Sequence, residues 1–303
     1  RSGGPGPVMA DDAADTATAA LAAAPALTEA AGPAPVLWEL LGSPPILAFV
    51  GGGGKTTLTL VTAAEASEAG PVVLMTTTRM LLPRVPEDVE KVLVAQELGE
   101  AQRLLREAFG AGARRVALVA GIEDSPHGPR ALGVAATWAP ALRGPGLAAS
   151  VVVKADGARR LAFKAPRAPR EPALPAGVVA VVAVAGADCL GQPLLEECVC
   201  RADVVAAATG AGLGDTVTPE VVGRVLGDKG LWCHALCRGQ ELRYYAAINK
   251  AEVAAGASAG AAAAATAAAN HGRGRGLAGV LLTGEGPGGA RGTVLHWVPL
   301  GET

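Results

Sequence analysis

The fold of this chain is decided by the stretch Ile46-Leu47-Ala48-Phe49-Val50-Gly51-Gly52-Gly53-Gly54-Lys55-Thr56-Thr57. Its apolar first half is short and ends at glycine, which is typical of a strand buried on both faces. Glycine adopts backbone angles that other residues avoid, so the N–H groups of residues 51–54 can line one concavity and bind an anion. Lys55 adds a positive charge, and the helix that follows adds the positive end of its dipole. The stretch therefore predicts a phosphate-binding loop.

The sequence around this loop supports the interpretation. After Lys55, apolar residues continue at helical spacing until Gly70 and Pro71 end the pattern. Residues 72–75 form a second apolar run, so the region reads as a βαβ unit. The usual motif has glycine where this chain has Phe49, so the loop is a shortened form. The alternative, a flexible glycine-rich turn before Lys-Thr, fits these flanks less well.

Composition limits the classes of protein to consider. Half of the 303 residues are apolar and only 3% are aromatic, which allows one large α/β domain or two smaller ones with a core of Val, Leu and Ala. The net charge of −2 and the pI of about 6.1 favour neither nucleic acid nor an anionic membrane as partner. No apolar run approaches the ~20 residues that a membrane helix needs. We therefore expect a soluble protein.

The N-terminal segment differs in composition from the rest. Residues 1–35 are rich in Ala, Gly and Pro and show no periodicity, so we expect disorder or a linker there. We divide the chain into a low-complexity segment, residues 1–43, and a single P-loop NTPase-like α/β domain, residues 44–303. The first residue is Arg1 rather than Met, so organelle targeting stays open.

The cysteines indicate a reducing compartment, with the cytoplasm as the expected location. Their odd number argues against a disulfide framework. The spacings Cys198-x-Cys200 and Cys233-His234-x-x-Cys237 match no known zinc pair, so we expect structural thiols rather than metal ligands. The complete set is Cys189, Cys198, Cys200, Cys233 and Cys237.

Apolar and amphipathic runs beyond the first βαβ unit alternate along the chain, which predicts a doubly wound, mostly parallel sheet in a three-layer α/β/α arrangement. The expected strands are residues 91–95, 115–120, 151–153, 178–184, 244–248, 279–283 and 293–298, the last two as a pair. The expected helices are residues 96–109, 131–142 and 191–209, one that Thr218 and Pro219 open, and a surface helix within the Ala/Gly-rich residues 253–276.

A second stretch carries an acid to the end of a strand. Residues 151–153 are apolar and lead into Lys154-Ala155-Asp156-Gly157. In P-loop enzymes an acid at this position orders the Mg²⁺ shell, and the glycine N–H binds the terminal phosphate. Asp-Gly is also an ordinary turn, so the stretch gains weight only from the upstream loop. We expect Lys55 and Asp156 to be catalytic, Thr56 and Asp156 to hold Mg²⁺, and Gly157 to contact the γ-phosphate.

A third stretch, Asn249-Lys250-Ala251-Glu252, follows another strand. GTPases carry Asn-Lys-x-Asp here, where Asn supports the loop and the base, the Lys stem lies along the purine, and the acid accepts from the guanine edge. Glu252 is one methylene longer, so GTP is only slightly favoured over ATP. The alternative is a plain strand end that enters a helix. The expected nucleotide-binding set is Gly51, Gly52, Gly53, Gly54, Lys55, Thr56, Thr57, Gly157, Asn249, Lys250 and Glu252.

Two further features have both a functional and an ordinary interpretation. Thr76-Thr77-Thr78 follows the second strand, where a threonine can sense a terminal phosphate or a metal, or can simply end the strand. Residues 161–177 are rich in proline, and several arginines lie within or beside them. This segment is either a lid that clamps an anionic substrate or a solvated loop.

Together these motifs resemble the YqeC-type proteins, which are described as accessory proteins of selenium-dependent molybdenum hydroxylases or as selenium cofactor biosynthesis proteins. The resemblance covers roughly residues 45–255, and it implies a P-loop NTPase fold and a role in maturing a molybdenum hydroxylase. The matching stretches, in chain order, are Gly51-Gly52-Gly53-Gly54-Lys55-Thr56-Thr57, Thr76-Thr77-Thr78, Ala155-Asp156-Gly157-Ala158-Arg159-Arg160, Lys164-Ala165-Pro166, Glu171-Pro172 and Gly191-x-Pro193-Leu194.

The chain departs from that family pattern at three positions. Lys154 stands where the family usually has Glu, Arg170 stands before Glu-Pro in place of His, and Cys200 replaces a frequent His. Lys154 inverts a charge beside the expected metal site, a swing of a few kcal/mol at about 4 Å. This departure bears on Mg²⁺ binding and hydrolysis more than on nucleotide binding.

The sequence therefore predicts Mg²⁺-dependent binding and hydrolysis of a purine triphosphate, in a cycle that serves a molybdenum hydroxylase client or cofactor delivery. Two alternatives remain open. One is a small-molecule kinase in which the arginines of residues 159–170 bind an anionic acceptor. The other is a scaffold that binds nucleotide without turnover, which Lys154 favours.

Overall fold

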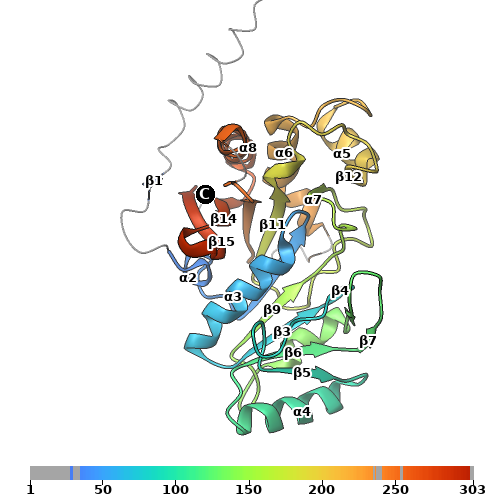
Figure 1. The fold of residues 1–303 in the computed structure, drawn as a ribbon, viewed down its shortest axis with the longest axis vertical. Helices are drawn as coiled ribbons and strands as arrows, with labels where there is room; N and C mark the ends of the chain where they lie inside the picture. Colours follow the sequence, from blue (N-terminus) through green and yellow to red (C-terminus); the bar gives the residue numbers. More distant parts are fainter. Residues whose placement is uncertain (1–27, 30–34, 235, 237–240, 253–254, 301–303) are drawn as a thin grey trace, which may run out of the picture.

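The computed structural model describes residues 28–29, 35–234, 236, 241–252 and 255–300 (Figure 1). Within these residues a ten-stranded sheet crosses the molecule, and its pairs are parallel from β14 to β5 and antiparallel at β15 and β1. The strand order is β1 (Thr28–Glu29), β15 (Arg291–Pro299), β14 (Leu277–Glu285), β13 (Arg243–Asn249), β11 (Ala180–Gly186), β2 (Ile46–Gly51), β9 (Ser150–Lys154), β3 (Val72–Thr76), β6 (Arg115–Val119) and β5 (Lys91–Val94).

This arrangement confirms the doubly wound, mostly parallel α/β fold, and every strand that we expected is present with small shifts of its ends. The side chains of β2 alternate between two apolar clusters, as the period of a strand requires. Leu47 and Phe49 pack with α2 (Leu37–Leu40) and α3 (Lys55–Ala69). The other face packs against α4 (Leu98–Gly110), α5 (Ala202–Thr209), α6 (Pro219–Gly227), α7 (Lys229–Cys233) and α8 (Ala255–Gly272).

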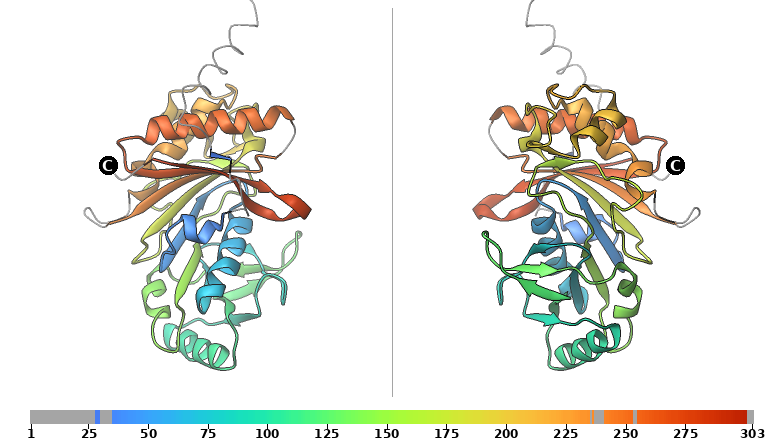
Figure 2. Two further views of the ribbon diagram at one scale, coloured as in Figure 1. Left: turned by 90° about the vertical axis from the view of Figure 1, so that its left-hand side faces the viewer. Right: turned by 90° about the vertical axis from the view of Figure 1, so that its right-hand side faces the viewer.

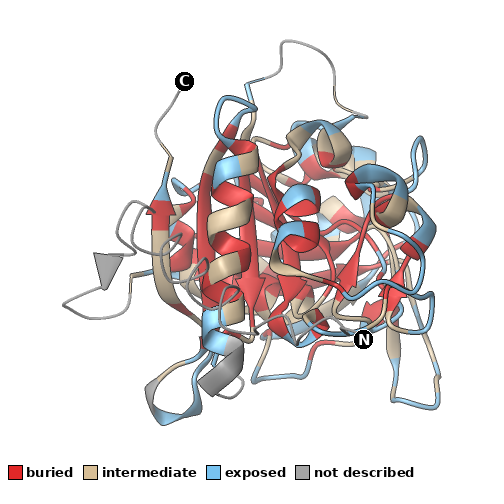
Figure 3. Cartoon of the chain, turned by 90° about the horizontal axis from the view of Figure 1, so that it is seen from above, coloured by how far each residue is buried: buried red, intermediate tan, exposed pale blue. Residues whose placement is uncertain are grey.

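The sheet is therefore the middle of three layers. Figure 2 shows α3 and α8 on opposite sides of it. The central strands β2, β3, β9 and β11 are buried along their whole length (Figure 3), whereas the edge strands β5 and β15 are not. Val, Leu and Ala supply almost all of this core, as the low aromatic content predicts.

Strand β2 lies at the point where the chain changes direction across the sheet. It pairs with β9 on one side and with β11 on the other. The chain that follows β2 first builds β3, β5, β6 and β9 on one side of it, and the later chain builds β11, β13 and β14 on the other side. In open parallel sheets, a crevice forms at the carboxyl ends of the strands at such a switch point. The glycine loop after β2 lies at this crevice.

The folded part of the chain begins ahead of the boundary that we expected at residue 44. Leu37 and Trp38 in α2, and Leu41 after it, are buried. Glu65 of α3 accepts hydrogen bonds from the backbone N–H of Leu37 at 3.2 Å and of Trp38 at 2.7 Å, so it satisfies the free amides at the start of α2. Most of the predicted low-complexity segment, residues 1–27 and 30–34, lies outside the described residues.

The helix predicted at residues 131–142 is wrong. Residues 130–132 form a short strand, β8 (Arg130–Leu132), between β4 (Met80–Leu81) and β7 (Gly121–Glu123) in a small antiparallel sheet. A 3-10 helix, η1 (Ala136–Leu142), follows. Pro140 lies inside it and has no N–H to donate, so an α-helical ladder cannot run through it. The small sheet covers one side of the crevice.

The helix predicted at residues 191–209 is present only in its second half, as α5. Before it, β12 (Val199–Cys200) pairs with β10 (Phe163–Lys164), and Pro193 forms an isolated bridge with Thr216. Arg201 has a left-handed φ of 67°, which breaks the helical path just before α5. Two short 3-10 helices, η2 (Ala187–Cys189) and η3 (Pro287–Gly289), complete the described elements.

The predicted surface helix of residues 253–276 is instead largely buried. It appears as α8, and its alanines pack against α6, where a side chain on Gly223 would lie 2.4 Å from the Cβ of Ala267. Small residues on both helices allow this close approach, which the low polarity of the segment alone did not reveal. Residues 253–254 lie outside the described part of the chain. Among the described helices, none combines the length and the apolar character needed to cross a bilayer.

Candidate functional site

The glycine loop is held tightly by its surroundings. Gly51, Gly53 and Gly54 have φ values of 98°, 59° and 121°. The backbone N–H of Gly52 donates to Val184 O at 2.7 Å, and that of Gly53 donates to Leu161 O at 3.2 Å. The Gly51 N–H donates to Asp156 Oδ2 at 3.0 Å. The amides of Gly51, Gly52 and Gly53 are therefore bound to protein acceptors in this conformation.

This differs from the expectation that all four glycine amides face an anion. The free donors lie one step further along the chain, at the start of α3. The first N–H groups of a helix have no acceptor within the helix. Gly54 is the N-cap of α3 and has no side chain to occupy them. Gly54, Lys55 and Thr56 all line the crevice. The positive end of α3 is thus the part of the loop that faces solvent.

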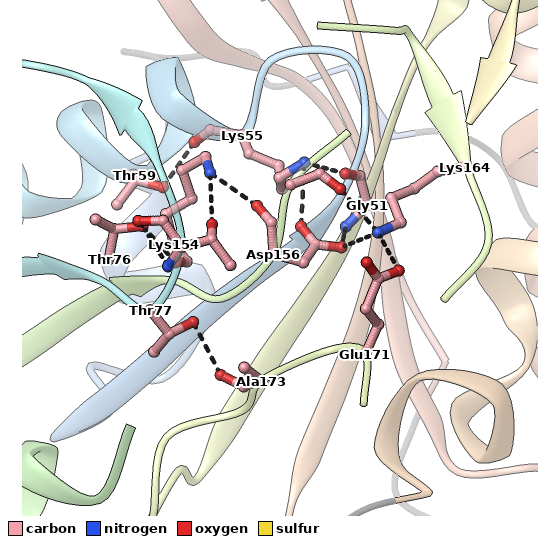
Figure 4. Close-up of polar contacts among 12 residues, drawn as sticks. Gly51, Lys55, Thr59, Thr76, Thr77, Lys154, Asp156, Lys164, Glu171 and Ala173 are labelled. Atoms are coloured by element: carbon pink, nitrogen blue, oxygen red, sulfur yellow. Dashed lines mark hydrogen bonds and ion pairs between the residues drawn. The ribbon is translucent and has the colours of Figure 1, made fainter. Parts of the chain in front are cut away.

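A buried ionic cluster joins the loop to β9 (Figure 4). Asp156 is 1% exposed and lies between two ammonium groups: Lys55 Nζ is 3.1 Å from Oδ1, and Lys164 Nζ is 3.2 Å from Oδ2. Lys55 also donates to the carbonyl of Gly51. Lys164, which is fully buried, pairs with Glu171 at 3.0 Å and donates to the Gly157 carbonyl at 2.8 Å. The two residues that we expected to be catalytic are in direct contact.

The electrostatics of this cluster follow from burial and from charge. Burial opposes ionisation of Asp156, but the ammonium groups of Lys55 and Lys164 outweigh it and lower the pKa of the carboxyl group. Burial lowers the pKa of Lys55, and attraction to Asp156 only partly offsets this. Burial also disfavours the charge of Lys164, yet Asp156 and Glu171 together raise its pKa. Asp156 is thus held as a carboxylate.

Lys154, one of the three departures from the family pattern, lies at the same edge of the sheet (Figure 4). Its Nζ donates to Asp156 O at 2.7 Å, to Arg79 O at 2.9 Å and to Thr78 Oγ1 at 3.2 Å. These acceptors are neutral. Burial and the positive charge of Lys55 lower the pKa of Lys154 to about 7. Lys154 therefore ties the segment after β3 to β9.

The crevice is a cavity of about 730 Å³ with a strongly cationic wall. Positively charged side chains approach it from α3, β9, β8 and three loops, whereas Glu171 is the acidic residue in its lining. The lining residues are Gly53, Gly54, Lys55, Thr56, Thr78, Arg79, Met80, Leu81, His127, Arg130, Lys154, Gly157, Ala158, Arg159, Arg160, Leu161, Glu171 and Lys250. Such a wall favours an anionic ligand.

The third predicted stretch reaches the site in part. Asn249 Nδ2 donates to Gly53 O at 2.9 Å, and Asn249 Oδ1 accepts from Thr283 Oγ1 at 2.9 Å, so Asn249 supports the loop. Lys250 lines the cavity and pairs with Asp188. Glu252 is exposed and lies against Gly284, outside the cavity lining. Thr57 is half-buried in α3 and also lies outside that lining.

The three threonines after β3 have different environments. Thr76 Oγ1 donates to Lys154 O at 3.1 Å, and Thr77 Oγ1 donates to Ala173 O at 3.1 Å, so both fix the backbone (Figure 4). Thr78 alone lines the cavity. Of the two interpretations given above, strand termination describes Thr76 and Thr77, whereas Thr78 keeps access to a ligand.

Several residues of the site were not singled out as site residues by sequence reasoning. Lys164 and Glu171 lie in the proline-rich segment that was predicted as a lid or a solvated loop, yet Lys164 is buried beside Asp156. Their presence in motifs that carry the family resemblance was the available signal. Arg79 and Arg130 gave no such signal, because only the small sheet brings them to the cavity.

The described cysteines are unpaired thiols: Cys189, Cys198, Cys200 and Cys233. Burial raises the pKa of Cys189 and of Cys233 to about 12, so neither is an ionised nucleophile at neutral pH. Cys237 lies outside the described residues. Within the described part of the chain, no group of three or more His, Cys, Asp or Glu side chains is placed to hold a metal ion.

Comparison of the chain with known proteins identifies the protein family to which it belongs. No curated protein and no solved structure matches the chain. A family model described as "YqeC protein" matches residues 47–203, which run from β2 through the glycine loop, Asp156 and Lys164 into α5. That range is slightly more than half of the chain and includes the buried ionic cluster, so the chain belongs to the YqeC family.

Proposed function

We propose that this protein binds a Mg²⁺–purine nucleotide, GTP or ATP, and hydrolyses it as an accessory or maturation factor for a molybdenum hydroxylase or its selenium cofactor. One observation carries the proposal: Lys55 Nζ, at the start of α3, lies 3.1 Å from Asp156 Oδ1 beside a cationic cavity. A strand, a glycine loop, this Lys-Thr pair and a neighbouring strand with Asp are the parts of a P-loop NTPase site.

The chemistry assigned to Lys55 is an exchange of partners. In the described conformation its ammonium group is held by Asp156 and by the carbonyl of Gly51. A triphosphate that enters the cavity offers oxygens of higher charge, and the amides at the start of α3 lie beside them. Moving Nζ onto the β- and γ-phosphates offsets part of their negative charge and frees Asp156 Oδ1 at the same time.

The residues present fit a Mg²⁺ ion. Asp156 Oδ1 is buried and accepts no hydrogen bond, because its contact with Lys55 is an ion pair of poor hydrogen-bond geometry. Thr56 lines the same cavity. Mg²⁺ typically takes one or two protein oxygens and completes its shell with water and phosphate. When bound, the ion supplies neutralising charge at the β- and γ-phosphate oxygens during phosphoryl transfer.

For the base, Lys250 and Asn249 support a purine site at the end of β13, since Lys250 lines the cavity and Asn249 fixes Gly53. The exposed position of Glu252 gives guanine no advantage over adenine, so both nucleotides remain candidates. Membership of the YqeC family supports the accessory role.

Titration of the full chain with MgGTP and MgATP tests the proposal. We expect Lys55→Ala to lower the affinity for the preferred nucleotide by about 10- to 100-fold, because a charge-assisted contact to phosphate contributes about 1.5–3 kcal/mol. Lys91→Ala removes an exposed lysine from β5 and is expected to bind like wild type. Equal affinity of Lys55→Ala and wild type would refute the site.

A second candidate function is a nucleotide-binding scaffold without turnover, which the position of Lys154 favours. Its Nζ lies 2.7 Å from Asp156 O, so its protonated form adds positive charge beside the carboxylate that would hold Mg²⁺. Phosphate release by wild type, Lys154→Glu and Lys154→Gln separates the two functions. We expect wild type to release phosphate from the nucleotide. If the protein is a scaffold, the wild type releases no phosphate, and only the Lys154→Glu variant gains turnover.

A further inference from the structure

The cavity is larger than the part that the phosphate loop and Lys250 line. On one side it is lined by the small sheet and its turns, through Met80, Leu81, His127 and Arg130. On another side it is lined by residues 157–161, which include Arg159 and Arg160. The proposed nucleotide contacts use none of these residues except Gly157.

The cations on these two sides differ in how far they are already neutralised. Arg79 pairs with Glu123 at 2.6 Å, and Arg159 pairs with Glu196 at 3.5 Å. Within the described residues, no acidic side chain forms an ion pair with Arg130 or Arg160. Lys154 contacts only neutral acceptors. Like charges gathered around one cavity repel each other, and a bound anion relieves that repulsion.

The backbone that carries Arg160 is strained. Arg159 and Arg160 have φ values of 50° and 68°, which places two consecutive non-glycine residues in the left-handed region. This conformation costs roughly 1–2 kcal/mol per residue, and such strain clusters at ligand sites. The segment is also tied to the phosphate loop, because Leu161 O accepts the Gly53 N–H at 3.2 Å. The strained arginines therefore sit next to the nucleotide side of the cavity.

The other wall of the same region is apolar. Met80 is buried beneath it, and Leu81, which is 51% exposed, lines the cavity. Lys154 donates to Arg79 O at 2.9 Å, which fixes the start of this strand against β9. Cations beside an exposed apolar side chain suit an organic anion better than a bare inorganic ion.

We propose that a small organic anion, carrying a phosphate or carboxylate group, binds beside the nucleotide as a second ligand. Arg130 and Arg160 bind its charged group, and Leu81 contacts its apolar part. The proposal rests on the proposed function to the extent that nucleotide occupies the phosphate-loop side of the cavity. The second subsite itself is made by residues that the nucleotide does not need.

Phenyl phosphate, benzoate and phenol are suitable probes, because they share a ring and differ in charge. The full chain is titrated with each by calorimetry, with and without a saturating non-hydrolysable GTP or ATP analogue and Mg²⁺. We expect saturable binding of phenyl phosphate or benzoate while the analogue is bound, and none of phenol. The stronger of the two anions identifies the charged group that the subsite prefers.

The double variant Arg130→Gln/Arg160→Gln is expected to weaken binding of the anionic probe by about tenfold or more, since both charge-assisted contacts to its anionic group are lost. Its affinity for the nucleotide analogue is expected to change less than threefold. Arg103→Gln/Arg291→Gln removes the same charge from exposed positions outside the cavity and is expected to leave both affinities unchanged.

Three results would overturn the proposal: no saturable binding of either anion, displacement of the anion by the nucleotide analogue, or equal weakening of analogue and anion in the double variant. If the nucleotide analogue displaces the anion, and Lys55→Ala also weakens binding of the anion, the probe occupies the phosphate loop. If wild type binds neither nucleotide but binds the anion through Arg130 and Arg160, the proposed function fails and the anion subsite stands.

Discussion

Replacement of Asp156 by alanine is expected to lower the free energy of unfolding by about 3–5 kcal/mol, because it leaves buried charges without their partner. Asp156 is 1% exposed, and its two ion-pair partners, Lys55 and Lys164, are 5% and 0% exposed. The Gly51 N–H, 3.0 Å from Oδ2, loses its acceptor as well. Lys164 retains Glu171 as its only acidic partner among the described residues. The effect is large because none of these groups can turn to water without moving the loop.

Urea denaturation followed by tryptophan fluorescence measures this loss. Asp203→Ala is a control, since Asp203 also forms an ion pair, with Arg167 at 2.7 Å, but both side chains are 52% exposed. Exposed pairs of this kind contribute about 0–1 kcal/mol. If Asp156→Ala loses no more stability than Asp203→Ala, the cluster does not hold the loop, and its role would lie only in ligand binding.

Replacement of Gly53 by alanine is expected to destabilise the protein by about 2–5 kcal/mol and to abolish nucleotide binding at micromolar ligand. Gly53 has a φ of 59°, and a Cβ there would lie 2.0 Å from Gly186 N and 2.6 Å from Ala162 O. Both obstacles are backbone atoms, so no rotation of a side chain relieves the clash. The loop would have to move away from β11, and the start of α3 would move with it.

The variant Gly112→Ala separates the cost of the steric clash at Gly53 from the cost of placing alanine at a positive φ. Gly112 has a φ of 92°, but a Cβ there would meet nothing within 4 Å. It is expected to cost about 1–2 kcal/mol, which is the left-handed penalty alone, and to leave nucleotide affinity unchanged. Chemical denaturation and nucleotide titration of both variants give the comparison. Similar losses at the two positions would show that the loop adapts readily and is not a rigid anion cradle.

Local sequence was sufficient for the first βαβ unit. The run from Ile46 to Val50 has no polar residue and ends at glycine, so it fits a strand with helices on both faces, which is where β2 lies. Gly70 ends α3 as expected, and Thr218 caps α6 through a bond from the Val221 N–H at 3.3 Å. These features depend on nearest neighbours along the chain, which is why the sequence reveals them.

Local sequence failed where contacts between distant segments decided the outcome. Residues 131–142 carry apolar residues at a spacing that suits a helix, but pairing of β8 with β4 and β7 gave a better use of their backbone groups. The alanines of α8 looked like a surface helix, yet Gly223 on α6 lets the two helices approach closely enough to bury them. Neither partner is adjacent in sequence.

By itself the sequence determined the strand, the glycine loop, Lys55 at the start of a helix and an acid at the end of another strand, because these are short patterns with a single local geometry. Tertiary structure alone decided that Lys164 joins Lys55 on Asp156, that the amides of Gly51 to Gly53 bind the protein, and that Arg130 and Arg160 share one cavity. Electrostatic energy depends on distance in space and on burial, and separation along the chain predicts neither.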